Sequence, residues 1–401
     1  MPMRTWLLTT PADYDLGHVD AVLPGRVVRN ARVVVRDGVI VEVAPHPPGA
    51  VTDVDGGGLH LLPGLVDVHN DTLGRECHPR PGASLDLDFA IASAGARLRA
   101  AGITTAFHGL AYQERSAVGV PIDSPRAPEL APVVDAAAGP VADHRVLHRL
   151  DQRCPAGRAQ LEQRLASLPA GEIPVVSHED HTPGQGQYAD PRTMQRWLEV
   201  GERMSPEQAA EHVAWWRTSR DRAVTVRDET LDWLGALARA GRIQLWGHDP
   251  ATADDVDALI ARGGRVAEFP TTRVAAERAR AGGLAIVAGA PNVVRGGSHA
   301  GNVSAAELAA AGLVDVLASD YLPAALLPAA VQLARAGTVP LPAAVGLVTA
   351  GPAAAVGLHD RGQLIPGRRA DLVLADLSAP HPIVHWVTRA GHVRGHRAVR
   401  S

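Results

Sequence analysis

The spacing of apolar and polar positions differs between the two ends of the chain and its middle. Residues 25–60 and the last forty residues contain short β-branched runs broken by Gly, by Asn and by the hairpin signal Asp-Gly at 37–38. Such runs are typical of short paired strands. Because both ends share the pattern, we expect residues 1–58 and 356–401 to form one small β-sandwich domain.

The middle of the chain, residues 59–355, follows a different period. Eight strand-like apolar runs are separated there by stretches with helical spacing: "HLLPGLVDVHND", "GITTAFHG", "HRVLHRLD", "IPVVSHED", "RIQLWGHD", "GRVAEFPT", "LAIVAGAPN" and "VDVLASD". Strands that alternate with helices form parallel sheets. Eight such units predict an α/β fold, a (β/α)8 TIM barrel.

Helices are expected between these runs, at 90–101, 158–167, 227–240, 253–262, 273–281 and 304–311. The interval 182–241 is too long for one crossover, so it predicts a helical insertion in the barrel. Within it, "SPEQAAEHVAWW" places Ser205 as an N-cap and Pro206 in the first turn of a helix. A lid over the barrel is one role that such an insertion can take.

Most of the eight runs end in a side chain that can bind a metal ion or move a proton. These are His69 and Asp71, His108, Asp151, Asp180 with His181, His248 with Asp249, Glu268, and Asp320. The C-terminal ends of barrel strands meet on the face that carries active sites. A lone histidine at a strand end is more often a hydrogen-bonded turn residue. Agreement among seven strands favours a shared site, and His69 and Asp71 lie on one face because strand side chains repeat every two residues.

Histidine nitrogen and carboxylate oxygen, without thiolate, suit Zn²⁺, Mn²⁺, Fe²⁺, Co²⁺ or Ni²⁺. The pattern therefore predicts one or two divalent transition-metal ions, with Zn²⁺ the first candidate. Such ions lower the pKa of a bound water and clamp the charge of an oxyanion, which is what hydrolysis requires. Asp320 could both ligate a metal and accept the proton of that water.

A second polar cluster follows the seventh run, in "GAPNVVRGGSHAGN". Its candidates for substrate contact are Asn292, Arg295, Ser298 and His299. Loops after strands seven and eight often hold phosphate in these barrels, because glycines admit backbone N–H groups and arginine adds a bidentate charge. A Gly-rich connection with an incidental arginine is an equally good interpretation. Arg80 in "HPRPG" is a further candidate, although a surface turn is the commoner role of such a segment.

Composition narrows the classes of function. The net charge is −4 without blocks of like charge, so nothing indicates a nucleic-acid or membrane partner. The chain has no lysine, which excludes Schiff-base catalysis and a carboxylated-lysine metal bridge. Two cysteines are too few for a disulfide framework. With no signal-peptide pattern and no apolar run of about 18 residues, we expect a cytoplasmic enzyme with a small-molecule substrate, and a homo-oligomer is possible.

The motifs together resemble the amidohydrolase superfamily, whose members are mostly metal-dependent hydrolases. The closer resemblance is to one family in it, the α-D-ribose 1-methylphosphonate 5-triphosphate diphosphatases of the carbon–phosphorus lyase pathway of phosphonate metabolism. The segments that carry this resemblance run from residue 61 to about 376: "LLPGLVDVHNDTL", "PRPG", "AGITT", "DHTPGQGQY", "HDPAT", "AEFPTT", "GAPNVVRGGSHAGN", "LASDYLPAALL" and "GRRADLVLAD". Such enzymes release pyrophosphate from a ribose 5-triphosphate by metal-activated water.

The resemblance implies roles for individual residues. The implied metal ligands are His69, Asp71, His181, His248 and Asp320, and the implied phosphate or substrate contacts are Arg295 and His299. Asp151 stands where the family has glutamate and is a further ligand candidate that could bridge two metals. Glu268 replaces the superfamily's usual histidine on the sixth strand. We count Glu268 and Asp180 among the substrate-binding candidates.

Three departures from the family lie around strands one and two. In the motif of strand one, the family has asparagine at the position of Thr72 and an acidic residue at the position of Gly74. In the helix before strand two, Ala94-Gly95 replaces a His-Asp pair, and after strand two His108 replaces an aspartate. The pattern favours retained metal chemistry with an altered substrate pocket. Two alternatives therefore stay open: hydrolysis of a cyclic amide or amidine at its C–N bond, and an inactive binding protein on the same scaffold.

Overall fold

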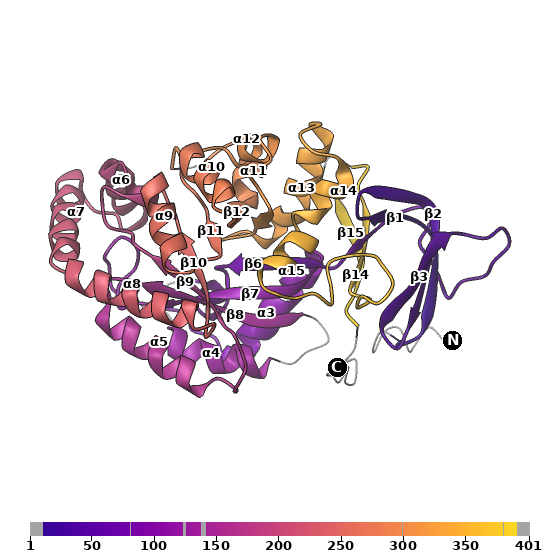
Figure 1. Cartoon of the computed structure of the whole chain (residues 1–401), viewed down its shortest axis with the longest axis horizontal. Helices are drawn as coiled ribbons and strands as arrows, with labels where there is room; N and C mark the ends of the chain where they lie inside the picture. Colours follow the sequence, from indigo (N-terminus) through magenta and orange to yellow (C-terminus); the bar gives the residue numbers. More distant parts are fainter. Residues whose placement is uncertain are drawn as a thin grey trace.

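A computed structural model describes residues 11–80, 82–122, 126–137, 142–298, 300–379 and 381–390. Its larger part is a parallel barrel wrapped by helices, and a mixed sheet lies at one end of the molecule (Figure 1). The predicted TIM barrel is thus confirmed, and the small domain expected as a β-sandwich from both ends of the chain is found as one mixed sheet with strands from both ends. No helix in the described ranges is long and apolar enough to cross a membrane.

The eight barrel strands pair in the order in which they occur along the chain. They are β6 (Leu65–Asn70), β7 (Ile103–Tyr112), β8 (Asp143–Asp151), β9 (Val175–Glu179), β10 (Gln244–His248), β11 (Val266–Glu268), β12 (Ala285–Gly289) and β13 (Val316–Ala318). The ring closes where β6 and β13 end. There the Asp320 amide donates to the His69 carbonyl at 2.9 Å, and the Asp71 amide donates to the Asp320 carbonyl at 2.7 Å. Closure therefore fixes the backbone of three candidate site residues.

The barrel interior is packed with apolar side chains below that closure. One buried cluster contains Val66, Val68, Phe107, Leu147, Val175, Trp246, Val266, Val287, Val316 and Ala318. Branched side chains of this kind fill TIM barrels in layers, so the interior is a core and not a pore. The polar residues at the strand ends lie directly above this packed core, which holds their backbone in place.

Helices cover the outside of the barrel. They are α2 (Leu73–Cys77), α3 (Leu87–Ala100), α4 (Ala127–Ala136), α5 (Pro155–Ser167), α8 (Val224–Arg239), α9 (Ala253–Ala261), α10 (Arg273–Ala281), α11 (Ala290–Arg295), α12 (Ala305–Ala310), α13 (Leu326–Arg335), α14 (Leu341–Gly346) and α15 (Ala350–Ala355), with the 3-10 turn η2 (Pro323–Ala325). The six helices expected from the sequence are all found, within about three residues of the expected bounds. Their apolar faces join the outward side chains of the strands in the main core.

The predicted insertion forms two helices at the end of the molecule opposite the mixed sheet (Figure 1). It comprises η1 (Gly186–Tyr188), α6 (Pro191–Gly201) and α7 (Pro206–Asp221), whereas α8 is the crossover helix that leads to β10. Ser205 caps α7 as expected, because its hydroxyl accepts from the Gln208 amide and the Gln208 side chain returns to the Ser205 amide. The insertion has its own core, which includes Tyr188, Met194 and Trp216.

The mixed sheet takes strands from both ends of the chain. It contains β1 (Tyr14–Leu23), β2 (Arg26–Arg36), β3 (Val39–Pro45), β4 (Val54–Asp55), β5 (His60–Pro63), β14 (Leu372–Asp376) and β15 (Ile383–Thr388). The run "HLLPGLVDVHND", expected as one strand, is divided at Gly64 between β5 of this sheet and β6 of the barrel. A Cβ at Gly64 would lie 2.2 Å from the Thr104 hydroxyl oxygen, so only glycine fits this crossing.

Candidate metal centre

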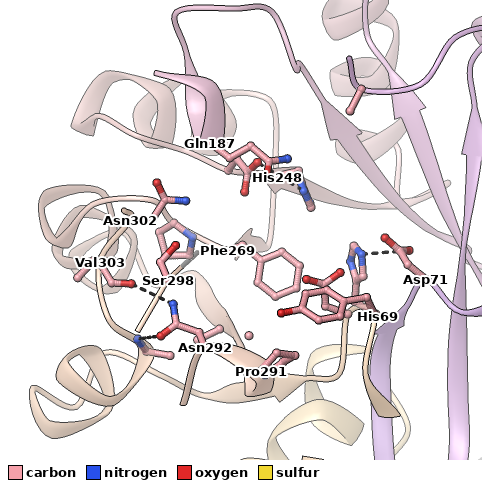
Figure 2. Close-up of a pocket in the computed structure, with 18 of the residues that line it drawn as sticks. His69, Asp71, Gln187, His248, Phe269, Pro291, Asn292, Ser298, Asn302 and Val303 are labelled. Atoms are coloured by element: carbon pink, nitrogen blue, oxygen red, sulfur yellow. Dashed lines mark hydrogen bonds and ion pairs between the residues drawn. The ribbon is translucent and has the colours of Figure 1, made fainter. Parts of the chain in front are cut away.

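His69 reaches the barrel mouth through a β-bulge at the end of β6. The pairing of β6 with β7 shifts between Asp67 and Asn70, so that β6 contains one extra residue there. Val66, before the shift, and Val68, within it, both belong to the barrel core, and the extra residue allows the next side chain, His69, to turn inward as well. His69 Nε2 consequently lies 3.3 Å from Asp71 Oδ1. A dashed line marks this contact in Figure 2.

Glu268, at the end of β11, orients two of the histidines. One of its oxygens lies 2.7 Å from His69 Nδ1, and the other lies 2.8 Å from His248 Nδ1 and accepts from the Ser177 hydroxyl at 2.5 Å. The Nε2 atoms of both rings are left to face the mouth, as in metal sites whose histidines are held by a carboxylate. Burial alone would raise the pKa of Glu268, but His69 and His248 hold that pKa well below its usual range.

A first group of ligand atoms comes from His69, Asp71 and Asp320, whose nitrogen and oxygen atoms lie within 4.8 Å of one another. Asp320 lies two residues after the end of β13 and has a left-handed backbone, with φ of 55°. Burial, and then the nearby Asp71 carboxylate, raise the pKa of Asp320. Three predicted ligands from opposite ends of the barrel sequence therefore meet at one point.

A second group comes from Glu179, His181 and His248, again with ligand atoms within 4.8 Å of one another. Asp249 stands beside it, because its Oδ2 lies 3.7 Å from His248 Nε2 and 3.9 Å from His181 Nε2. The sequence analysis did not select Glu179. A signal was available, since Glu179 alternates with Ser177 along β9 and Ser177 also faces inward.

Arg149 lies between the two groups and was also missed. Its guanidinium donates to Asp71 Oδ2 and, from Nη2 at 2.6 Å, to Glu179 Oε2. It thus binds one oxygen of each carboxylate, and its charge lowers the pKa of Asp71 and of Glu179, the latter to about 2, against the opposing effect of burial. Gly109 on β7 makes room for this arrangement, because a Cβ there would lie 2.2 Å from Asp71 Oδ1.

Three buried ligand atoms of this centre make no hydrogen bond to any residue that the structure describes. They are Asp71 Oδ1, His181 Nε2 and Asp249 Oδ2. An unsatisfied buried polar atom costs about 1–3 kcal/mol, so a bound cation that these atoms contact would remove that cost. Nitrogen and oxygen donors in this number suit divalent transition metals, and they do not choose one element. The residues therefore fit a metal centre of the kind that the strand ends predicted.

Asp151 and Asp180 turn away from this centre. Both oxygens of Asp151 accept from Arg220, at 2.6 and 2.7 Å, and Asp180 accepts from Arg153 at 2.7 Å and from Arg220 at 3.0 Å. The structure therefore does not bring Asp151 to the metal groups or Asp180 to a substrate, because arginines occupy their oxygens. The inward position near the end of β8 belongs to Arg149.

A cavity of about 400 Å³ opens above the centre. Its lining includes Asn292 and Arg295 of α11 with Ser298 and Asn302 of the loop that follows, and Gln187, Tyr188 and Trp197 of the insertion. Figure 2 labels Asn292, Ser298, Asn302 and Gln187 around the cavity. The side chain of Asn292 holds this segment in place. Its Nδ2 donates to the Val303 carbonyl at 3.3 Å, and its Oδ1 accepts from the Ala305 backbone amide at 3.0 Å. Arg295 is exposed, and no described residue forms an ion pair with it.

Other residues selected from the sequence lie elsewhere. Arg80 is exposed and Glu268 is buried beneath the histidines, and neither lines the described cavity, so the structure does not bring them to a substrate. His299 lies outside the described residues. His108 lies four residues before the end of β7 and faces His144 at 2.9 Å, and burial lowers its pKa to about 3.

The departures from the family are also outside the cavity. Ala94 and Gly95 are buried in α3, and neither these two, nor Thr72 and Gly74, nor His108 is among the described residues that line it. The expectation that these changes alter the substrate pocket therefore has no support in the cavity lining.

Comparison with known proteins places this geometry in a family. No protein-family model matches the chain. Among solved structures, enamidase, a member of the amidohydrolase superfamily, has a TM-score of 0.58 at 15% identity and covers 94% of each chain. N-isopropylammelide isopropylaminohydrolase from Burkholderia multivorans ATCC 17616 has a TM-score of 0.60 at 17% identity, covering 94% of this chain and 97% of its own. These two share the fold.

A curated relative is decisive. The alpha-D-ribose 1-methylphosphonate 5-triphosphate diphosphatase of Escherichia coli (strain K12) is 36% identical over 389 residues, which cover 94% of this chain and 98% of the relative. The chain belongs to the amidohydrolase superfamily, in the family of this diphosphatase. The resemblance drawn from the motifs is confirmed, and the protein is a metal-dependent hydrolase with the His, Glu and Asp clusters typical of amidohydrolase metal sites.

Proposed function

We propose that this amidohydrolase is a diphosphatase that releases pyrophosphate from a ribose 5-triphosphate, the compound class named for its Escherichia coli relative. The observation that carries the proposal is the relationship to that enzyme, which spans 94% of this chain and 98% of the relative. It is supported by two ligand groups beneath a cavity whose wall holds a Gly-rich segment and Arg295, with which no described residue forms an ion pair. The substrate is accordingly a phosphorylated small molecule.

In the proposed hydrolysis, the residues of the site have separate roles. Divalent ions, when bound, supply an activated water and screen the phosphate charge. The water oxygen adds to a phosphorus atom, the bond from that phosphorus to the pyrophosphate oxygen breaks, and Asp320 accepts the proton of the water. Glu268 keeps His69 and His248 in place, and Arg295 faces the position where phosphate oxygens would lie.

The charge of the cavity makes the proposed reaction dependent on metal. Its described lining contains the carboxylates of Asp71, Asp249 and Asp320 but only two arginines, Arg149 and Arg295. This lining does not neutralise a triphosphate by itself. We therefore expect pyrophosphate release from a ribose 5-triphosphate ester to stop after chelation and to return with Zn²⁺ or Mn²⁺, as measured by coupled pyrophosphate detection with elemental analysis of the protein. Undiminished release from fully chelated protein, or none with any metal, would contradict the proposal.

Arg295 is expected to contribute directly to substrate binding. Arg295→Ala should lower kcat/KM for the triphosphate by about 10- to 100-fold, because a hydrogen bond to a charged group contributes about 1.5–3 kcal/mol. Steady-state kinetics at saturating metal measures the effect. Arg26→Ala, at an exposed arginine of the mixed sheet, removes the same charge and should leave the kinetics unchanged. Equal kinetics for both variants would show that Arg295 does not contact the substrate.

Hydrolysis of a cyclic amide is a second candidate, favoured by one observation. Among the described lining residues, Arg295 is the only arginine that is not engaged by carboxylates, and a substrate with a single carboxylate would need only one such cation. Turnover of a dihydropyrimidine or lactam, with no pyrophosphate released from any triphosphate, would establish this candidate over the first.

A further inference from the structure

We propose that Arg220, a residue of the insertion, positions the second ligand group by holding the turn that carries His181. The inference rests on the proposed metal-dependent function, to which it adds a positioning residue outside the barrel. Arg220 belongs to the last turn of α7 and is 4% exposed. Burying a charged guanidinium costs free energy unless it is paired, so the partners of Arg220 at the strand ends indicate its role.

The guanidinium of Arg220 joins two barrel strands. Its Nη1 and Nη2 donate to the carboxylate of Asp151, at the end of β8, at 2.6 and 2.7 Å. Its Nη2 also donates to Asp180 Oδ1 at 3.0 Å, and its Nε donates to the Thr182 hydroxyl at 3.1 Å. Asp180 and Thr182 are the two neighbours of His181. The Arg220 side chain therefore binds the residues immediately before and after His181, a candidate metal ligand.

The turn itself is closed by local hydrogen bonds. Asp180 Oδ1 accepts from the Thr182 amide at 3.1 Å and from the Thr182 hydroxyl at 2.5 Å. The side chains on either side of His181 thus face Arg220, while the His181 ring faces His248, with ring centroids 5.8 Å apart and planes at 90°. Because Arg220 fixes the side chains of Asp180 and Thr182, the ring of His181 between them is directed toward His248.

The other side of Arg220 is connected to the insertion. Its guanidinium lies over the ring of Trp216, 5.2 Å from the centroid, and Trp216 belongs to the insertion core. That ring packs closely on Gly119, in the loop after β7, where a Cβ would lie 2.6 Å from it. Contacts therefore run without a break from the insertion core through Arg220 to the turn of His181.

Arg220→Met should weaken the second metal site selectively. Loss of residues that orient metal ligands typically costs about 10- to 100-fold in metal affinity. We expect the native chain to bind about two Zn²⁺ ions. In the variant, the ion at Glu179, His181 and His248 should bind about 10- to 100-fold more weakly, while the ion at His69, Asp71 and Asp320 is retained. Zn²⁺ titration of chelated protein measures both affinities, and anomalous scattering at the zinc edge identifies the weakened site.

Two further variants separate positioning from general stability. Arg361→Met removes a comparably buried arginine, 6% exposed, which donates to Asp143 at 2.6 Å at the opposite end of β8, and it should leave both Zn²⁺ affinities unchanged. Thr182→Val keeps the shape of the side chain and the backbone hydrogen bond to Asp180, but it removes the hydroxyl that contacts Arg220 and Asp180. It should weaken the same Zn²⁺ site as Arg220→Met, by a smaller factor.

The outcomes are distinct from those of the pyrophosphate assay. A native protein that holds both Zn²⁺ ions but releases no pyrophosphate would refute the proposed substrate and leave this inference intact. Native affinities in Arg220→Met, equal weakening of both sites, or a native chain with a single Zn²⁺ site would each overturn the inference. If Arg220→Met fails to fold, Thr182→Val decides, and an unchanged second Zn²⁺ affinity in that variant would overturn it.

Discussion

Replacing Asp320 by Asn is expected to lower kcat for pyrophosphate release by about 10²- to 10⁴-fold, the contribution typical of a general base. An amide cannot accept the proton of the attacking water, and it is a weaker metal ligand than a carboxylate. The fold should survive, because the backbone of Asp320, and not its side chain, pairs with His69 and Asp71 at the barrel closure. Asparagine also tolerates the left-handed backbone found at this position.

The measurement separates proton transfer from metal binding. The kcat of Asp320→Asn is compared with that of the native enzyme at saturating metal, and the metal content of both proteins is determined. Asp254→Asn, at an exposed carboxylate in the first turn of α9, is the matched control and should keep native kcat. A variant at Asp320 that keeps native metal content and more than about a tenth of kcat would show that another group takes the proton.

The barrel was predictable because its signal repeats. The strands are largely buried apolar runs and stretches with helical spacing separate them, so eight similar units can be recognised without any tertiary information. The junction between β5 and β6 was not predictable in the same way. Both strands are buried, so the apolar run continues through Gly64 although the chain passes there from one sheet to another.

The candidate site was predictable where strand ends alone decide it. The structure brings together His69, Asp71, His181, His248 and Asp320, because parallel strands end on one face of the barrel. At the ends of β8 and β9, the sequence predicted the wrong one of several neighbouring charged residues as the inward-facing one. At the end of β9 the inward residue is Glu179 and not Asp180, a difference of one position that lies within the uncertainty of any strand boundary.

Asp151 illustrates a different limit. Its partner Arg220 lies 69 residues further along the chain, in an insertion whose docking no local pattern reveals. Once Arg220 occupies both oxygens of Asp151, the role expected of that carboxylate is open to Glu179, which Arg149 holds by one oxygen. Long-range ion pairs therefore decided which acidic residues face the metal centre.

Arg149→Met is expected to destabilise the metal-free protein by about 3–5 kcal/mol, the usual cost of removing one partner from a buried ion pair. Among the described residues, Arg149 is the one arginine that forms an ion pair with both Asp71 and Glu179, so its loss leaves these two buried carboxylates without the cation they share. Bound divalent ions bring positive charge to the same oxygens. The destabilisation should therefore be much smaller in protein saturated with Zn²⁺.

Urea unfolding of native and variant protein, with a chelator and with excess Zn²⁺, measures the four free energies of unfolding that this argument needs. Arg361→Met provides the comparison, because it also breaks a buried pair, with Asp143, but far from any ligand group. Its destabilisation should be the same with and without Zn²⁺. If Arg149→Met behaves like Arg361→Met, then Arg149 acts as an ordinary structural arginine. A loss confined to the chelated protein instead means that Arg149 and the metal ions compensate the same negative charge.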